Sequence, residues 1–260
     1  MLVLDKSASM SERLGGDSKW TAAVSAVTRL TTQDSRIRLG LAMFSDAESA
    51  CSPGRIFVPI AANNAAEIQA ALPAAADGTQ TQLAGGLSVG AADLSLTDPA
   101  RANGVVVITD GLANCKGSQP DPNSADDPRL VVQGLLARPV SVRTWVVGIG
   151  SGVDATMMTN MAILGGTARS VSPRYYQVDS AVDLQTALNE IAIAALSCTV
   201  TLSRTPPSGS SGLGVAINGQ PVPNDPSRRS GWDLADTSLT LYGSACEALT
   251  EGGQLSVARK

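Results

Sequence analysis

The sequence predicts an α/β fold: a Rossmann-like, doubly wound, mostly parallel sheet flanked by helices. A small antiparallel β domain follows it in the chain. Over about the first 197 residues, apolar strand-like runs alternate with helix-length amphipathic stretches, the pattern of consecutive βαβ units. After Cys198 the pattern changes to period-two alternation broken by Gly, Pro, Ser and Asn, which is typical of short antiparallel strands. We therefore divide the chain into residues 1–197 and 198–260.

Six apolar runs form the expected sheet. In order they are Leu2–Leu4, Ile37–Phe44, Ile56–Ile60, Val105–Ile108, Val142–Ile149 and Tyr175–Val178. The fourth and fifth are almost continuously apolar, as expected for central strands covered on both faces.

Six amphipathic stretches between these runs predict helices. They are Trp20–Leu30, Ala65–Ala76, Leu83–Leu94, Pro128–Leu136, Ala155–Leu164 and Ala181–Leu196. Several follow good capping residues, such as Asp126 or Asp127 before Pro128 and Asp154 before Ala155. Trp20 and Trp145 are expected in the core or between helices and sheet, and Met10 beneath its loop.

The C-terminal segment predicts hairpins. Its "INGQPV" places an Asn-Gly turn between strand-like runs, a strong local hairpin signal, and "SLTLYG" and "QLSVAR" predict two more strands.

Composition narrows the class of protein. With 43% hydrophobic and 16% charged residues, the chain should bury a core; with only 3% aromatics, that core must consist of Ala, Val, Leu and Ile. The net charge of −4, without a Lys/Arg cluster, argues against nucleic-acid binding. No apolar stretch reaches the ~18 residues that a membrane span needs. No secretory signal is expected either, because Asp5 and Lys6 interrupt the first apolar run.

The cysteines predict disulfides. His is absent, so a metal site would need oxygen or Cys ligands. None of the four Cys forms a C-x-x-C pair, which disfavours a zinc cluster. Four separated cysteines fit two disulfides and an oxidising compartment better; four reduced thiols in a cytosolic protein are the alternative.

Four cysteines allow three pairings. Cys198 stands at the domain boundary and Cys246 near the chain end, so we pair them as a staple for a small module that buries little surface. Cys51 and Cys115 are both expected near the polar edge of the sheet, so we pair them as well. Extracytoplasmic localisation follows: secreted, periplasmic or lipid-anchored at the cell surface, with any signal segment absent from this chain.

Polar side chains follow several strands, where ligands of open parallel sheets bind. Asp5, Ser7 and Ser9 come just after the first strand, Thr109 and Asp110 follow the "VVVI" run, and Thr79 and Thr81 precede a helix. An all-oxygen set of this kind suits a hard divalent cation. Taken singly, such residues are more often caps and turns.

Taken together and in this order, the residues resemble the metal-ion-dependent adhesion site of the von Willebrand factor A family, which reads D-x-S-x-S, then T, then D. The matching residues are Asp5, Ser7, Ser9, Thr79 and Asp110, with Gly111 following as in the family's T-D-G pattern. The resemblance implies that the three hydroxyls bind Mg²⁺, or Mn²⁺ or Ca²⁺, directly. The two carboxylates would hold the ion at least partly through water.

The same resemblance implies a protein-binding device and not an enzyme. Neutral hydroxyl ligands leave the cation's charge incompletely neutralised, and an open position would capture a Glu or Asp side chain of a protein partner. The family's first strand usually starts earlier than here, and the sequence leaves open whether an upstream signal or lipid anchor was removed from the natural protein. The C-terminal segment looks like a small β module that follows such domains in secreted or lipid-anchored proteins of myxobacteria.

Alternatives stay open at this point. A haloacid-dehalogenase-type phosphohydrolase also has an Asp after its first strand, but Ser7 replaces its second Asp and cannot act as a general acid. A structural domain with a vestigial metal site is a further alternative. Thr81 is better explained by helix capping than by ligation. The acidic residues of Gly117–Pro128 fit solvated turns better than a calcium site. Oligomeric state and partner identity are not encoded in any motif.

Overall fold

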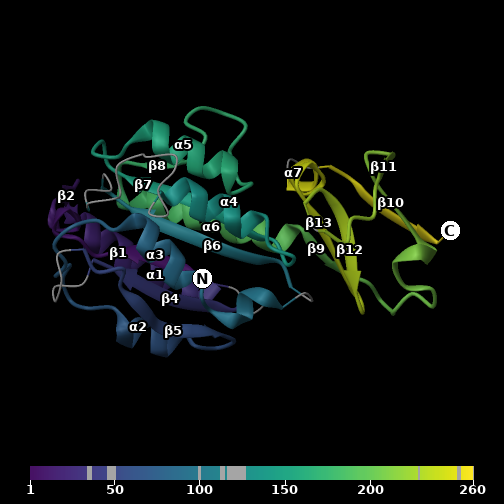
Figure 1. Ribbon diagram of the computed structural model, residues 1–260, viewed down its shortest axis with the longest axis horizontal. Helices are drawn as coiled ribbons and strands as arrows, with labels where there is room; N and C mark the ends of the chain where they lie inside the picture. Colours follow the sequence, from purple (N-terminus) through teal and green to yellow (C-terminus); the bar gives the residue numbers. More distant parts are fainter. Residues whose placement is uncertain are drawn as a thin grey trace.

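Figure 1 shows a larger lobe, in which helices cover both faces of one sheet, and a smaller lobe made of the C-terminal strands. This computed structural model describes residues 1–33, 37–45, 51–98, 101–111, 115, 127–227, 229–250 and 253–259. The N-terminus lies within the larger lobe and the C-terminus at the far end of the smaller one.

The larger lobe contains a six-stranded sheet in the order β5-β4-β1-β6-β7-β8. β5 pairs with β4 antiparallel, and every other pair is parallel. The prediction of a mostly parallel α/β sheet is therefore confirmed, with β6 and β7 in its interior. The strands are β1 (Leu2–Asp5), β4 (Leu39–Phe44), β5 (Arg55–Ala61), β6 (Asn103–Thr109), β7 (Val142–Ile149) and β8 (Tyr176–Val178).

Two hydrophobic clusters, one on each face of this sheet, form the core. Successive side chains of a strand point to opposite faces, so in β1 Leu2 and Leu4 join one cluster and Val3 joins the other. The first cluster also contains Trp20 and Trp145, as predicted. The helices of the lobe are α1 (Lys19–Gln33), α2 (Ala65–Ala71), α3 (Leu83–Gly90), α4 (Pro128–Leu136), α5 (Ala155–Leu164) and α6 (Ala181–Ser197).

Two helices end earlier than predicted. α2 stops at Ala71 because Leu72 precedes Pro73 and takes an extended conformation, as residues before proline do. α3 stops at Gly90, and Asp93 then caps the separate short helix η2 (Leu94–Thr97) by accepting the Ser95 N–H at 2.8 Å.

Two helix starts agree with the predicted caps. Asp127 accepts the Arg129 N–H at 2.8 Å, with Pro128 in the first turn of α4. Asp154 accepts the N–H groups of the second and third residues of α5. Asp126 lies outside the described residues.

A short hairpin between β1 and α1 is a feature that the sequence patterns do not predict. After the single turn η1 (Ala8–Ser11), β2 (Arg13–Leu14) and β3 (Asp17–Ser18) pair antiparallel. Met10 is fully buried beneath this segment, as expected. The hairpin returns the chain to the sheet edge, where α1 begins.

The C-terminal module consists of two three-stranded antiparallel sheets, β11-β10-β14 and β12-β13-β9. Asn218 and Gly219 both have positive φ in the β10–β11 hairpin, as the Asn-Gly turn predicts. The sequence patterns miss α7 and β12. The elements are β9 (Thr199–Thr201), η3 (Gly209–Gly212), β10 (Leu213–Ile217), β11 (Gln220–Val222), β12 (Gly231–Ala235), β13 (Ser238–Tyr242), α7 (Ser244–Thr250) and β14 (Leu255–Arg259).

Two disulfides join the cysteines in the pairs that the sequence favours. Cys51 and Cys115 have Cα atoms 5.6 Å apart, and those of Cys198 and Cys246 are 5.2 Å apart. The second bridge links Cys198, which stands between α6 and β9, to Cys246 in α7 of the module.

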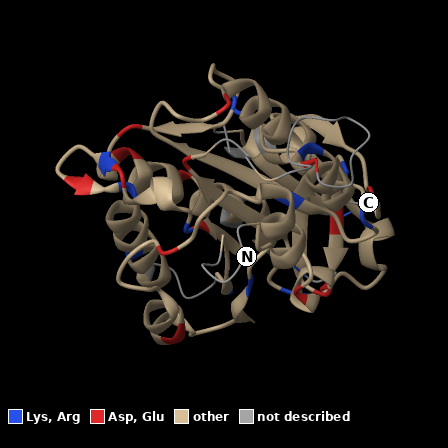
Figure 2. Ribbon diagram, turned by 60° about the vertical axis from the view of Figure 1, so that its left-hand side comes forward, with Lys and Arg blue, Asp and Glu red and all other residues tan. Residues whose placement is uncertain are grey.

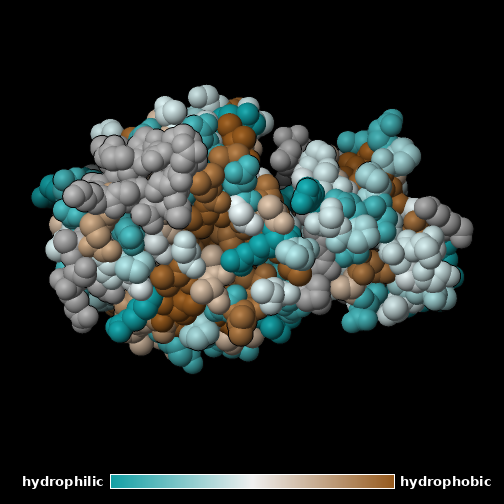
Figure 3. Space-filling model, viewed as in Figure 1, coloured by the Kyte–Doolittle hydropathy of each residue, from teal (hydrophilic) through white to brown (hydrophobic). Residues whose placement is uncertain are grey.

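Charged residues of both signs are spread along the described chain (Figure 2). Figure 2 shows Lys and Arg interspersed with Asp and Glu, and Figure 3 shows hydrophobic residues on the helical face of the larger lobe. Exposed large hydrophobic side chains include Leu94, Leu130, Ile163, Val182 and Ile193. Among the described helices, none combines the length and apolar character needed to cross a membrane.

Candidate metal centre

Two adjacent parallel strands end at the same edge of the sheet and bring their polar ends together. β1 pairs with β6 in the register Leu4 opposite Ile108, so Asp5 and Thr109 leave their strands side by side. Asp110 follows Thr109 directly. The topology therefore joins residues more than a hundred positions apart in the chain.

Asp5 is fully buried and both of its carboxylate oxygens accept hydrogen bonds. The Ser7 N–H donates to Oδ1 at 2.8 Å and the Thr109 hydroxyl donates to Oδ2 at 2.5 Å. Burial raises the pKa of Asp5 to about 6, with a smaller contribution from the charge of Asp110, and the hydrogen bonds oppose the rise. The carboxylate is thus fixed in orientation at a position that water does not reach.

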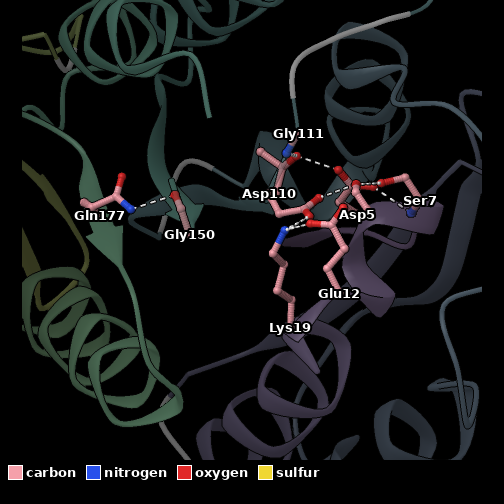
Figure 4. Close-up of polar contacts among 10 residues, drawn as sticks. Asp5, Ser7, Glu12, Lys19, Asp110, Gly111, Gly150 and Gln177 are labelled. Atoms are coloured by element: carbon pink, nitrogen blue, oxygen red, sulfur yellow. Dashed lines mark hydrogen bonds and ion pairs between the residues drawn. The ribbon is translucent and has the colours of Figure 1, made fainter. Parts of the chain in front are cut away.

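Ser7, Ser9 and Asp110 continue this arrangement as a chain of side-chain oxygens, of which Figure 4 labels Ser7 and Asp110. The two serine Oγ atoms are 3.1 Å apart, and the Ser9 hydroxyl donates to Asp110 Oδ1 at 2.8 Å. Ligand oxygens at about 2.1 Å around an octahedral cation lie about 3 Å from their neighbours. The spacing seen here therefore matches the edge of such a shell.

Lys19 supplies a positive charge at the other oxygen of Asp110. Its Nζ lies 2.7 Å from Asp110 Oδ2 and 2.7 Å from Glu12 Oε2, as Figure 4 shows. Burial would lower the pKa of Lys19, but the hydrogen bonds and charges of Asp110 and Glu12 outweigh it and raise that pKa. Lys19 therefore remains an ammonium group.

The loop before α3 brings the Thr81 hydroxyl to the same edge, and it can do so because residue 78 is glycine. The Gly78 N–H donates to Lys6 O at 2.8 Å, and a Cβ at this position would lie 1.8 Å from Ser45 O. Thr79 is exposed. Thr81 is 2% exposed, and its Oγ1 would be 2.8 Å from a Cβ at Gly111. The structure thus places Thr81 beside the loop that carries Asp110.

The helix-capping explanation for Thr81 needs correction, since the N-cap position of α3 is Gln82. The sequence pattern assigned Thr79 to the cation and Thr81 to the helix cap, although both lie close to the helix start. Contact with Gly111 across the site is a tertiary signal that no local pattern contains.

The donor chemistry fits a hard divalent cation. The candidate ligands are hydroxyl and carboxylate oxygens only, which Mg²⁺, Mn²⁺ and Ca²⁺ prefer. In the described part of the chain, no three Asp, Glu or Cys side chains gather as a metal-binding group. A cation here would therefore depend on the serine and threonine hydroxyls.

The family comparison agrees with this geometry. Residues 1–112, which contain every candidate ligand named above, match the model of the von Willebrand factor type A domain. The larger lobe has the von Willebrand factor type A fold. No curated protein matches the chain in sequence.

Solved structures with this fold include adhesion and matrix proteins. Proximal thread matrix protein 1 from the mussel byssus is 20% identical, with a TM-score of 0.54 over 78% of this chain and 49% of its own. A second structure of that mussel protein is described as having a zinc-occupied metal-ion-dependent adhesion site. This chain spans about half the length of the mussel protein.

Two bacterial structures cover both lobes. The pilus adhesin SpaC from Lactobacillus rhamnosus GG is 16% identical, with a TM-score of 0.54 over 99% of this chain and 38% of its own. A von Willebrand factor type A protein from Catenulispora acidiphila is 15% identical, with a TM-score of 0.55 over 98% of this chain and 55% of its own. At these identities the likeness shows the fold.

Two further predictions concern the Gly117–Pro128 loop and the C-terminal module. Most of the acidic Gly117–Pro128 loop lies outside the described residues; of its members, Asp127 caps α4. The resemblance of the C-terminal module to myxobacterial modules stays a prediction.

Proposed function

We propose that this chain is a metal-dependent protein-binding module, without enzymatic activity, that captures an acidic side chain of a partner. The observation that supports this most directly is the convergence of the Ser7 and Ser9 hydroxyls with Asp5 and Asp110 at one sheet edge. A bound Mg²⁺ or Mn²⁺ would supply a Lewis-acidic position for a carboxylate of the partner.

The candidate residues have two proposed roles: some orient the loop and retain the cation, and others bind it directly. Asp5 is already held by Ser7 and Thr109, so we assign it to orienting the loop and retaining the ion. Ser7 and Ser9 are assigned as direct donors. For the third hydroxyl we favour Thr81 over Thr79, because Thr81 is buried against Gly111 while Thr79 is exposed.

The enzyme alternative lacks support in the residues present. A phosphohydrolase of the haloacid dehalogenase type needs a second carboxylate two positions after Asp5, and Ser7 stands there. A serine hydroxyl cannot exchange protons near neutral pH as that carboxylate does. Incubation with a generic phosphate ester and Mg²⁺ should give no turnover, and turnover that Asp5→Asn abolishes would reverse this assignment.

Cation binding is tested through thermal stability. A cation at a hundredfold excess over its dissociation constant stabilises the fold by about 2.7 kcal/mol, a melting-temperature rise of about 5–10 °C. Asp110→Ala should remove this rise, whereas Asp17→Ala, which removes an exposed carboxylate on β3, should retain it. An equal rise in the Asp110 variant would show that the site is misassigned.

The roles of the two threonines are tested by a Mn²⁺ titration of single variants. Thr81→Val keeps the shape but removes the hydroxyl, and it should weaken Mn²⁺ binding about tenfold or more. Thr79→Val should change it less than about threefold. The reverse order would restore Thr79 as the ligand.

Partner capture is tested by pull-down from the surface fraction of the source organism. Binding should require Mg²⁺, be lost with EDTA and be lost in the Asp110→Ala variant. Extracytoplasmic localisation, which the two disulfides support, would place the partner on a cell surface or in a matrix. Retention of the partner in EDTA would place the interface elsewhere on the domain.

A further inference from the structure

Lys19 is a buried cation in direct contact with a candidate metal ligand. It is the first residue of α1 and is 6% exposed. Its backbone N–H donates to Glu12 O at 2.9 Å across the β2–β3 hairpin, so the hairpin fixes where the side chain starts. The ammonium then ends 2.7 Å from Asp110 Oδ2, as Figure 4 shows.

The turn after β7 covers the aliphatic part of this side chain. Gly150, with φ of +72°, would place a Cβ 3.5 Å from Lys19 Cε. The stem is thus packed under the β7–α5 connection, and the charge stays at the metal edge. A buried charge requires a partner, and Asp110, whose side chain is fully buried, is the partner that shares this environment.

The groups that donate hydrogen bonds to Asp5 and Asp110 differ in charge. Ser7 and Thr109 bring neutral donors to Asp5, and Ser9 brings one to Asp110 Oδ1. Lys19 brings a full positive charge to the remaining oxygen of Asp110. The nearby Lys6 donates to Asp77 at 2.8 Å.

The formal charge of the site follows from these pairs. Asp5 and Asp110 together carry −2, and Lys19 reduces the sum to −1. A divalent cation would then leave the loaded site at +1, which a single carboxylate neutralises; without Lys19 the loaded site would be neutral. This sum counts the buried charges only: Glu12 contacts Lys19 from the rim with a side chain 66% exposed, and at the high effective dielectric constant of the rim its charge acts more weakly than those of the buried groups.

We propose that Lys19 acts as a resident monovalent cation of this site, which lowers its affinity for a divalent cation and keeps the loaded site positive toward an acidic ligand. The proposal rests on the proposed function and concerns how that same site is tuned. Like charges at short range in a desolvated environment repel strongly, so the ammonium reduces cation affinity while it neutralises Asp110.

The test is a Mn²⁺ titration of the full chain, with free Mn²⁺ measured by electron paramagnetic resonance. Lys19→Met should bind Mn²⁺ about tenfold more tightly than the wild type. Lys19→Gln, which removes the charge but retains a hydrogen-bond donor, should behave the same way and serves if the Met variant folds poorly. Lys19→Arg retains the charge and should stay within about threefold of the wild type.

A matched control removes an exposed positive charge from the same region. Arg13 lies exposed on β2, and Arg13→Gln should change Mn²⁺ affinity less than about twofold because solvent screens that charge. Unchanged or weaker binding in both Lys19→Met and Lys19→Gln would overturn the proposal and make Lys19 a clamp that positions Asp110.

Comparing Mn²⁺ binding by the wild type and by Lys19→Met separates failure of the proposed function from failure of the proposed role of Lys19. If the wild type binds no Mn²⁺ but Lys19→Met does, the role of Lys19 is supported and the proposed function of the native site fails. If neither binds, both fail.

Discussion

The larger lobe buries one hydrophobic cluster on each face of its sheet, whereas the C-terminal module has a single small cluster that includes Trp232 and Leu239. Within the residues that the structure describes, the buried charged side chains all lie in the larger lobe, and Asp5, Asp110 and Lys19 are at one edge of its sheet. Among the described residues of the module, the buried polar side chain is Thr240.

This difference indicates which region can offset the free-energy cost of buried charges. Desolvated charges cost free energy even when paired, and a sheet covered on both faces provides enough apolar burial to offset that cost. Each region has one disulfide, but the module has the smaller hydrophobic cluster, so the Cys198–Cys246 bond should contribute a larger share of its stability. We infer that the larger lobe can accommodate the buried charges of the candidate metal site, and that the folding of the module depends on its disulfide.

The largest expected effect comes from removing that bond. The double variant Cys198→Ser, Cys246→Ser opens a loop with a sequence separation of 48, which corresponds to about 4 kcal/mol on the loop-entropy model. Because the module has little other stabilisation, we expect its strands to lose amide protection in hydrogen exchange while β1, β6 and β7 keep theirs.

The comparison case is Cys51→Ser, Cys115→Ser, which opens a loop of similar length, with a separation of 64. The larger lobe should remain folded, since its two clusters do not depend on this bridge. Global loss of protection in this second variant, with an intact module in the first, would reverse our assignment of stability to the two regions.

A smaller effect is expected from substitution of Gly78. It tests whether the loop at the sheet edge near Asp5 and Asp110 has room for a Cβ atom. Gly78→Ala would place a Cβ against the backbone oxygens of Ser45 and Lys6, and such overpacking costs about 1–3 kcal/mol. Chemical denaturation should show this loss, together with a weaker Mg²⁺-dependent rise in melting temperature. Gly16→Ala is the control, since nothing lies within 4 Å of its added Cβ; equal losses in both variants would contradict the argument.

The smallest expected effect is in the module, at Asp225. Its carboxylate accepts hydrogen bonds from the backbone N–H groups of Ser227, Arg229 and Ser230, and from the Ser227 hydroxyl. Partial burial opposes ionisation, but these bonds outweigh it and hold the pKa of Asp225 below its usual 3.8. Asp225→Asn should therefore cost about 1 kcal/mol at neutral pH.

The pH dependence of that cost has a definite sign. A depressed folded-state pKa stabilises the fold fully above the unfolded-state pKa near 3.8, and the contribution is lost as the pH falls through the lower folded-state value. The difference between wild type and Asp225→Asn in denaturant unfolding should thus shrink when the pH is lowered from 6 to about 2.5. A difference that grows toward acid would show that the carboxylate is not the stabilising form.

The sequence by itself determined the alternation of strands and helices in the first 197 residues and the change of pattern after Cys198. These features depend on local periodicity, because a buried strand or an amphipathic helix shows its apolar face directly in the order of residues. The order of Asp5, Ser7, Ser9 and Asp110 was likewise visible, and so was the Asn218–Gly219 turn, whose backbone conformation is set by those two residues.

Only the tertiary structure decided which loop atoms meet. The end of α2 at Ala71 followed from Pro73, a local cause, but the position of Thr81 beside Gly111 depends on contacts between distant segments. Lys19 reaches Asp110, 91 residues away, because the β2–β3 hairpin starts α1 at the sheet edge. Hydrophobic periodicity specifies which face of an element is buried; it does not specify where a polar side chain in a loop ends, since that depends on contacts between segments distant in the chain.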